Sequence, residues 1–267
     1  NIRDLIKQRS GICLSDAKRD YLSVRLSRRM KATGAETVKE YCYYLKYDIG
    51  GETELSNLVD EVAINETYFF RDEEQLEDFS SHIVPMILKK NQVRSPIKIW
   101  SAGCSTGEEP YTLTMLLYEH PSRIEPTRIH IIGSDISSTV LQSAREGIYD
   151  QHSLRYVPPH YLLKYFIKTG DDQYAVSDKV KDRVRFAHVN LMDPFATARI
   201  REIDCIFCRN VILYFDDSDK EKCTEYLYRS LNKGGCLVLG RPEGLGRISG
   251  LFEVIRLKHT VIYGKPG

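Results

Sequence analysis

The chain has 267 residues, of which 42% are hydrophobic and 28% are charged, and its formal net charge is +1 at pH 7. This near-neutral charge argues against a chain that binds nucleic acid over its whole surface. No apolar run approaches the roughly 18 residues of a membrane-spanning helix, so we expect a globular cytoplasmic protein without membrane insertion.

Residues 1–60 predict an all-helical N-terminal domain. Its clearest helix lies in LSDAKRDYLSVRLSRRMKATG, with Ser15 as the expected N-cap and Gly34 as the residue that ends it. Basic residues gather in this part of the chain, which suggests an acidic partner there. A solvated basic face is the alternative interpretation. The arginines beside the apolar stripe of this helix are Arg25, Arg28 and Arg29.

From about residue 95, short apolar runs alternate with helical patterns. This alternation predicts a doubly wound α/β sheet, mostly parallel, as the core of a second domain over residues 61–267. Residues 151–180 interrupt the alternation and predict a short helix and a small hairpin, inserted between strand units. Ligands of such sheets bind at the carboxyl ends of the strands. The expected strands lie in PIKIW, RIHIIGSD, RVRFAHVN, IDCIFCRN and GGCLVLG.

The first of these strands ends in WSAGCSTGEEP. Gly103 and Gly107 lack the G-x-G-x-x-G spacing of a dinucleotide site, and Glu108 and Glu109 stand where the next helix begins. Phosphate groups bind at helix N-termini that hold no competing anion, and each carboxylate would repel one by about 1 kcal/mol or more at an effective dielectric near 20. The turn therefore predicts a ligand that is uncharged or cationic there. The alternative is that the glutamates only stabilise the helix N-terminus.

Polar residues also follow the next three strands. Asp135 is placed to accept hydrogen bonds from both hydroxyls of a ribose, unless it only caps the following helix. Asn190 and Asn210 can each donate and accept hydrogen bonds, which suits an adenine edge or an amino acid group. A nucleoside that has no phosphate, and that carries an amino acid and a positive charge, describes S-adenosylmethionine.

The segment NETYFFRD covers residues 65–72, where the helical region gives way to the sheet. Its side chains do not follow a single helical stripe. We interpret it as a packed linker between the domains, with Phe69 and Phe70 as its buried anchors.

The cysteines indicate neither disulfides nor a metal site. Their number is seven, and an odd number argues against a disulfide framework. Cys205 and Cys208 form a C-x-x-C, but they lie in a predicted strand and no second ligand pair accompanies them. We interpret both as core residues.

Five segments, taken in order, closely resemble the chemotaxis receptor methyltransferases, the CheR-type protein-glutamate O-methyltransferases: NETYFFRD, WSAGCSTGEEPYT, GSDIS, VNLMD and CRNVILYFD. The resemblance covers nearly the whole chain. It implies a Rossmann-like methyltransferase sheet with a small β-subdomain insertion and a helical N-terminal domain. It also implies that Arg71 and Tyr214 lie near the transferred methyl group as catalytic residues. The expected cofactor-binding residues are Asn65, Thr67, Arg71, Gly103, Glu109, Asp135, Asn190, Leu191, Asn210 and Val211.

The resemblance further implies that a monomer methylates glutamates on receptor cytoplasmic helices and releases S-adenosylhomocysteine. The basic helix would then dock on the acidic receptor. One departure is the turn GRPEGLG, where the family usually has a Gly-His-Ser-Glu-like turn, although Glu243 remains. Members that bind a receptor's C-terminal pentapeptide have a longer, glycine-richer hairpin than KTGDDQYAVSDKV, so we expect no such tether.

Two other functions stay open. A methyltransferase for another acceptor, such as DNA, would carry an Asn/Asp-Pro-Pro-aromatic turn at the fourth strand end, where this chain has CRNV. A module that binds S-adenosylmethionine without catalysis is the second alternative.

Overall fold

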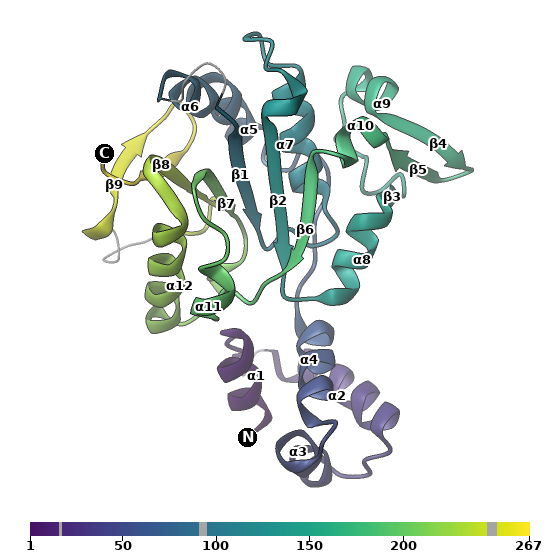
Figure 1. Ribbon diagram of the computed structural model, residues 1–267. Coiled ribbons are helices and arrows are strands. Elements are labelled where there is room, and N and C mark those ends of the chain that lie inside the picture. Colours follow the sequence, from purple (N-terminus) through teal and green to yellow (C-terminus); the bar gives the residue numbers. More distant parts are fainter. Residues whose placement is uncertain (16–17, 91–94, 245–249) are drawn as a thin grey trace.

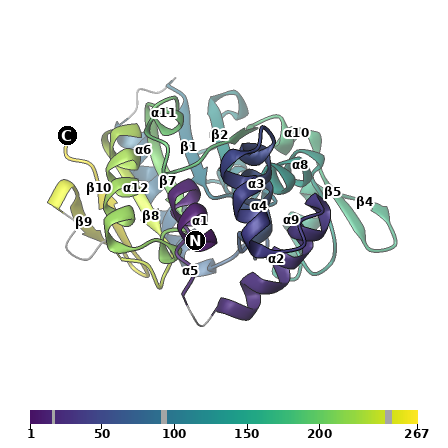
Figure 2. The same cartoon turned by 90° about the horizontal axis from the view of Figure 1, so that it is seen from below.

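The computed structural model describes residues 1–15, 18–90, 95–244 and 250–267. A helical domain lies below the carboxyl edge of a mixed sheet (Figure 1), and the view from below shows α1 to α4 lying across that edge (Figure 2). Among the described residues, no helix has the length and apolar character needed to cross a membrane.

The described part of the N-terminal domain contains four α-helices: α1 Ile2–Ser10, α2 Arg19–Thr33, α3 Val38–Tyr47 and α4 Gly51–Val62. Gly34 ends α2 in the left-handed conformation, as predicted. The N-cap prediction for Ser15 is wrong, because α2 begins at Arg19 and its N-cap is Lys18. Ser15 instead accepts the Lys18 N–H through its backbone carbonyl.

In the described part of the chain the main sheet has seven strands, in the order β6-β2-β1-β7-β8-β10-β9. The strands from β6 to β8 pair parallel, whereas β10 pairs antiparallel with both β8 and β9. The predicted mostly parallel sheet is therefore confirmed. Its strands are β1 Ile97–Ala102, β2 Ile129–Asp135, β6 Val184–His188, β7 Ile203–Cys208, β8 Leu231–Leu239, β9 Glu253–Arg256 and β10 Val261–Gly264.

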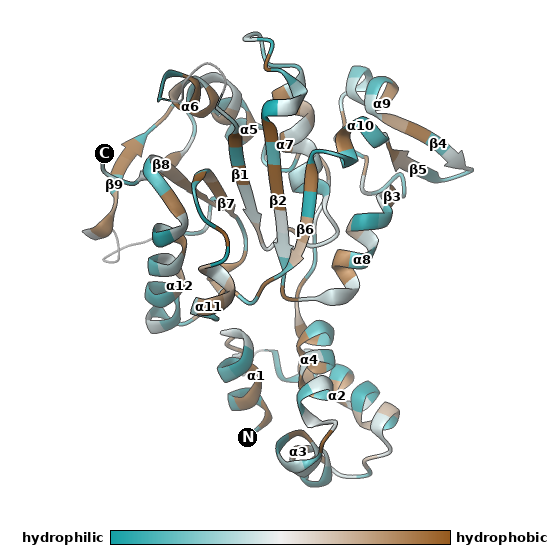
Figure 3. Ribbon diagram, in the orientation of Figure 1, coloured by the Kyte–Doolittle hydropathy of each residue, from teal (hydrophilic) through white to brown (hydrophobic). Residues whose placement is uncertain are grey.

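Helices cover both faces of this sheet, and the strands between them are apolar (Figure 3). Ile99 of β1 packs in the core beneath α5 and α7, whereas its neighbour Trp100 packs in the core beneath α12. This alternation follows from the two-residue period of a strand. The helices of this domain are α5 Glu73–Asp78, α6 Val84–Lys90, α7 Glu108–Tyr118, α8 Ser138–Glu146, α10 Asp178–Lys181, α11 Pro194–Thr197 and α12 Asp217–Ser230, with a π-helical turn at Phe79–Ile83 and 3-10 turns at Pro126–Arg128 and Ile212–Tyr214.

Cys205 and Cys208 are both fully buried in β7, one in each core. They are core residues, as predicted, and because they face opposite sides of the sheet they cannot hold one ion together.

The insertion is a three-stranded antiparallel sheet in the order β3-β5-β4. Its hairpin, β4 Phe166–Gly170 and β5 Gln173–Val176, follows α9 Pro159–Tyr165. The sequence analysis missed the third strand, β3 Ile148–Tyr149, which is too short to show a periodic pattern.

Candidate cofactor and methyl-transfer site

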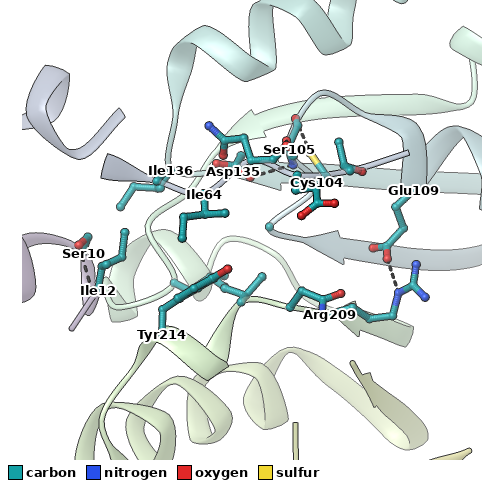
Figure 4. A pocket seen from close by; sticks show the side chains of 18 of the residues that line it. Ser10, Ile12, Ile64, Cys104, Ser105, Glu109, Asp135, Ile136, Arg209 and Tyr214 are labelled. Atoms are coloured by element: carbon teal, nitrogen blue, oxygen red, sulfur yellow. Dashed lines mark hydrogen bonds and ion pairs between the residues drawn. The ribbon is translucent and has the colours of Figure 1, made fainter. Parts of the chain in front are cut away.

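A cavity of about 930 Å³, including the part open to solvent, lies between the helical domain and the carboxyl edge of the sheet. Figure 4 shows side chains from both domains around it, among them Ser10 and Ile12 from the end of α1 and the segment after it. The structure brings all the expected cofactor-binding and catalytic residues to this one cavity: Asn65, Thr67, Arg71, Gly103, Glu109, Asp135, Asn190, Leu191, Asn210, Val211 and Tyr214.

Gly103 allows two strand-end turns to approach each other. Its φ is +83°, and a Cβ atom there would lie 2.3 Å from Cγ2 of Val211. Only glycine combines that backbone conformation with so close a neighbour. The turns after β1 and β7 therefore meet at the floor of the cavity.

Asp135 is held in place by the backbone on both sides of its carboxylate. Oδ2 accepts the Ser105 N–H at 2.8 Å and Oδ1 accepts the Ser137 N–H at 3.0 Å. The helix α8 takes its N-cap from Ser137, whose hydroxyl accepts the Val140 N–H, so Asp135 is not the N-cap. Burial raises the pKa of Asp135. A carboxylate has about four acceptor positions, so these backbone contacts leave acceptor capacity for a ligand.

The two glutamates of the first turn have separate environments. Glu108 is only 2% exposed and does not line the cavity; Thr106 Oγ1 donates to it at 2.7 Å. Burial raises its pKa to about 7. Glu109 lines the cavity, with Oε1 accepting the Ser101 hydroxyl at 2.6 Å. Only Glu109 therefore faces a ligand.

Arg209 is a buried lining residue that the sequence analysis missed. Its Nε donates to Oε2 of Glu109 at 2.6 Å, and its Nη1 donates to the backbone oxygen of Arg71 at 3.0 Å (Figure 4 shows the former). Asp72 and Gln75 accept from the same Nη1 at 3.3 and 3.1 Å. Glu109 is thus neutralised by a cation of the protein. The sequence did contain a signal for Arg209. A charged residue that directly follows a strongly apolar strand is expected to be buried, and a buried charge needs a partner of opposite charge.

The backbone around Arg71 is strained. Phe70 and Asp72 on either side have φ values of 59° and 58°, and such conformations cost about 1–3 kcal/mol each in residues other than glycine. Phe69 and Phe70 are buried, as predicted. The Phe69 N–H donates to the Ser153 carbonyl at 3.1 Å, which ties this segment to the insertion. The strain fixes where Arg71 lies on the cavity wall.

Glu243 joins the turn after β8 to the turn after β7. Its carboxylate accepts the N–H groups of Asn210 at 2.7 Å, Gly240 at 2.8 Å and Leu213 at 3.1 Å. The departure GRPEGLG, residues 240–246, therefore keeps the glutamate that positions Asn210; its last two residues, 245 and 246, lie outside the described residues. Asn210 has a φ of 60°, and its buried Oδ1 has no hydrogen-bond partner among the residues that the structure describes.

Hydrogen bonds connect the helical domain to two residues that line the cavity. Asn190 Nδ2 donates to the Arg9 carbonyl at 2.5 Å, and the Cys13 N–H donates to the Tyr214 carbonyl at 2.8 Å. Asn190 Oδ1 accepts the Met192 N–H at 2.9 Å, so one N–H of its amide remains for a ligand.

The arginines of α2 do not line the cavity, and they have different environments. Arg29 forms two hydrogen bonds with the buried Glu54, at 2.9 and 2.5 Å. Arg25 donates to the Glu61 carbonyl at 2.8 Å and stacks on a tyrosine. Arg28 lies 3.8 Å from the Glu61 carboxylate, and its side chain is 67% exposed. Arg28 is therefore the most accessible of the three.

Comparison with known proteins decides the family. Residues 65–261 match the family described as CheR methyltransferase, SAM binding domain, and residues 1–63 match CheR methyltransferase, all-alpha domain. The chain belongs to the CheR methyltransferase family. The chemotaxis protein methyltransferase 2 of Vibrio cholerae is 37% identical to this CheR chain over 264 residues, covering 99% of the chain and 91% of the relative. That of Borreliella burgdorferi is 36% identical, covering 87% and 83%.

This CheR protein is therefore a methyltransferase of chemotaxis, and S-adenosylmethionine is its methyl donor. The family assignment also accounts for the Rossmann-like sheet and the helical N-terminal domain.

Proposed function

We propose that this enzyme methylates glutamate side chains on the cytoplasmic helices of chemotaxis receptors, giving methyl esters. The observation that supports this proposal most is that Arg71 and Tyr214 both line this cavity, whose described lining residues include no histidine. Such a wall suits an acceptor that is already an anion, because an anion needs orientation but no general base.

The polar atoms of the cavity suit the donor. Asp135 would accept the ribose hydroxyls with its remaining lone pairs. Asn210 Oδ1, which is buried and unpartnered among the described residues, would accept an N–H of the ligand, and Gly103 would let the methionine part approach the backbone. Glu109 would accept from the amino group, and its pairing with Arg209 limits how strongly it attracts that cation.

S-adenosylmethionine supplies an electrophilic methyl group on a positively charged sulfur. A glutamate side chain has an unperturbed pKa of about 4.3 and is ionised near neutral pH, so one carboxylate oxygen attacks the methyl carbon as the carbon–sulfur bond breaks. Arg71 would orient this carboxylate; a tighter grip would stabilise the ground state and slow the transfer. Burial raises the pKa of Tyr214, which keeps its hydroxyl a donor.

Receptor docking would use the exposed side of α2. Arg28 is accessible, and Arg25 keeps part of its guanidinium free, whereas Arg29 is committed to Glu54. We therefore propose that Arg28 and Arg25 meet the acidic receptor and that Arg29 mainly holds α2 against α4.

Methyl-labelled S-adenosylmethionine and receptor cytoplasmic fragments test this function. Label that transfers to the fragment and is released by mild alkali identifies a methyl ester, and a fragment whose methylation-site glutamates are replaced by alanine should take up none. Tight cofactor binding without transfer would favour the non-catalytic module. Transfer that resists alkali would indicate another acceptor group.

A further inference from the structure

Two aromatic side chains that line the cavity are each covered by a cation from a different part of the chain. Lys18 Nζ, from the helical domain, lies 4.6 Å from the ring centre of Tyr214. On the other side, the Arg155 guanidinium lies 3.9 Å from the ring centre of Tyr68, and the Tyr156 ring packs on Tyr68 at 5.2 Å. We call Tyr68, Arg155 and Tyr156 the insertion rim.

The insertion rim is fixed to the catalytic segment by the backbone. The Phe69 N–H donates to Ser153, two residues before Arg155. Asp150 accepts the Ser153 N–H at 2.8 Å, and Leu154 is buried. These contacts hold residues 150–156 against the segment that contains Arg71, so the rim moves with the catalytic residues.

Arg155 has unused hydrogen-bonding capacity. Its Nη1 contacts only His152, donating to the carbonyl at 2.6 Å and lying 3.0 Å from Nδ1. Among the residues that the structure describes, no carboxylate forms an ion pair with it. Its Nε and Nη2 donors therefore remain available, and both Arg155 and Tyr156 are exposed to solvent.

Arg71 also lies close to the Tyr68 ring. Its guanidinium lies 5.6 Å from the centre of the Tyr68 ring, from which the Arg155 guanidinium lies 3.9 Å. Two guanidinium groups beside one ring offer two binding positions for carboxylates, and acidic residues three or four positions apart on a helix lie on one face, with Cβ atoms about 5–6 Å apart. The ring itself offers a flat surface for aliphatic side chains between them.

We propose that the insertion rim binds the receptor helix beside the reacting glutamate, with Arg155 pairing to an acidic residue one helical turn from it. This inference rests on the proposed function, and it assigns the rim to acceptor selection. Arg71 holds the glutamate that is methylated, Arg155 pairs with the acidic residue one turn away on the receptor helix, and Tyr156 packs on that helix. The enzyme then prefers sites with a second carboxylate one turn away.

The test compares Arg155→Glu with Lys168→Glu, which makes the same charge change on an exposed residue of β4 in the same insertion. We expect Arg155→Glu to lower kcat/KM for receptor fragments about tenfold, through KM, because attraction becomes repulsion. Lys168→Glu should stay within about twofold of the wild type. Affinity for S-adenosylhomocysteine, measured by calorimetry, should be unchanged in both variants.

A second arm identifies the partner carboxylate. Replacing the acid one turn from the methylated glutamate by glutamine should lower kcat/KM for the wild type, with no further loss for Arg155→Gln. If the wild type labels receptor fragments and Arg155→Glu does so equally well, the rim proposal is overturned while the proposed function stands. If the wild type transfers no alkali-labile methyl group to any receptor fragment, the proposed function itself fails.

Discussion

The guanidinium of Arg209 lies 2.6 Å from the carboxylate of Glu109, and both side chains are largely withdrawn from water. This pair connects the turn after β1 to the turn after β7, and Arg209 also donates to the backbone carbonyl of Arg71, the proposed catalytic residue. One ion pair therefore positions parts of the site that are about a hundred residues apart in the chain.

Removing one partner of this pair should be costly. We expect Arg209→Met to lower the free energy of unfolding by about 3–5 kcal/mol, because it leaves a buried carboxylate unpaired. The double variant Arg209→Met/Glu109→Gln should recover a large part of that loss in denaturant titrations. Its methyl transfer should remain slow, because the Arg71 carbonyl still lacks the hydrogen bond that Arg209 donates to it. Equal stability of the single and double variants would contradict an ionised pair.

Binding and turnover should separate along the cavity. Asp135→Ala should weaken S-adenosylmethionine and S-adenosylhomocysteine alike, about 10- to 100-fold, since its contacts are charge-assisted and do not sense the methyl group. Arg71→Ala and Tyr214→Phe should instead reduce kcat more than cofactor affinity. Calorimetry with both ligands, beside initial rates, measures this; unchanged affinity in Asp135→Ala would remove that residue from the ligand contacts.

Glu108 should make stability depend on pH. Burial raises its pKa from 4.5 to about 7 in the folded protein. As pH rises, Glu108 therefore loses its proton at a lower pH in the unfolded chain than in the folded protein. Wild-type stability should therefore fall relative to Glu108→Gln between about pH 4.5 and 7, by up to about 3 kcal/mol. Denaturant unfolding at pH 5 and pH 8 tests this, and a difference that does not change with pH would count against a buried, titrating Glu108.

The arginines of α2 should divide into structural and docking residues. Arg29→Ala leaves Glu54 buried without its partner, so thermal unfolding of this variant should occur at lower temperature. Arg28→Glu should leave the unfolding temperature unchanged and raise KM for the receptor, most strongly at low salt. Neither variant should alter cofactor affinity. If a variant with the charges of Arg25, Arg28 and Arg29 all reversed methylates the receptor normally, the basic side of α2 faces solvent only and does not dock on the receptor.

We predict that receptor methylation does not depend on a C-terminal pentapeptide. The outer edge of β4 is open, as an added peptide strand requires, so the prediction rests on the tight turn and on repulsion of an acidic tail by Asp171 and Asp172. Binding of the isolated pentapeptide, and methylation of receptors with and without their last residues, measure this dependence. Micromolar binding, or a large loss on tail removal, would refute the prediction.

Secondary-structure elements that follow a repeating pattern in the sequence were predictable. Contacts between two side chains far apart in the sequence were not. Alternating strands and helices, and polar residues after each strand, predicted the sheet and the edge at which Asp135 and Asn210 meet. The partners of Arg209 and Arg29 were missed because no local pattern says that Glu109 or Glu54 lies beside them. The Ser15 prediction was wrong because α2 begins at Arg19, and a serine before a helical pattern does not by itself mark the residue at which the helix begins.

Ser10 and Ile12 line the cavity together with residues of the sheet, so a ligand that fills it touches both domains. Its binding free energy then contributes to keeping the two domains together as well as to its own affinity. A ligand that fills the cavity would therefore act as a reversible crosslink between α1 and the sheet, and the two domains should separate less readily while it is bound.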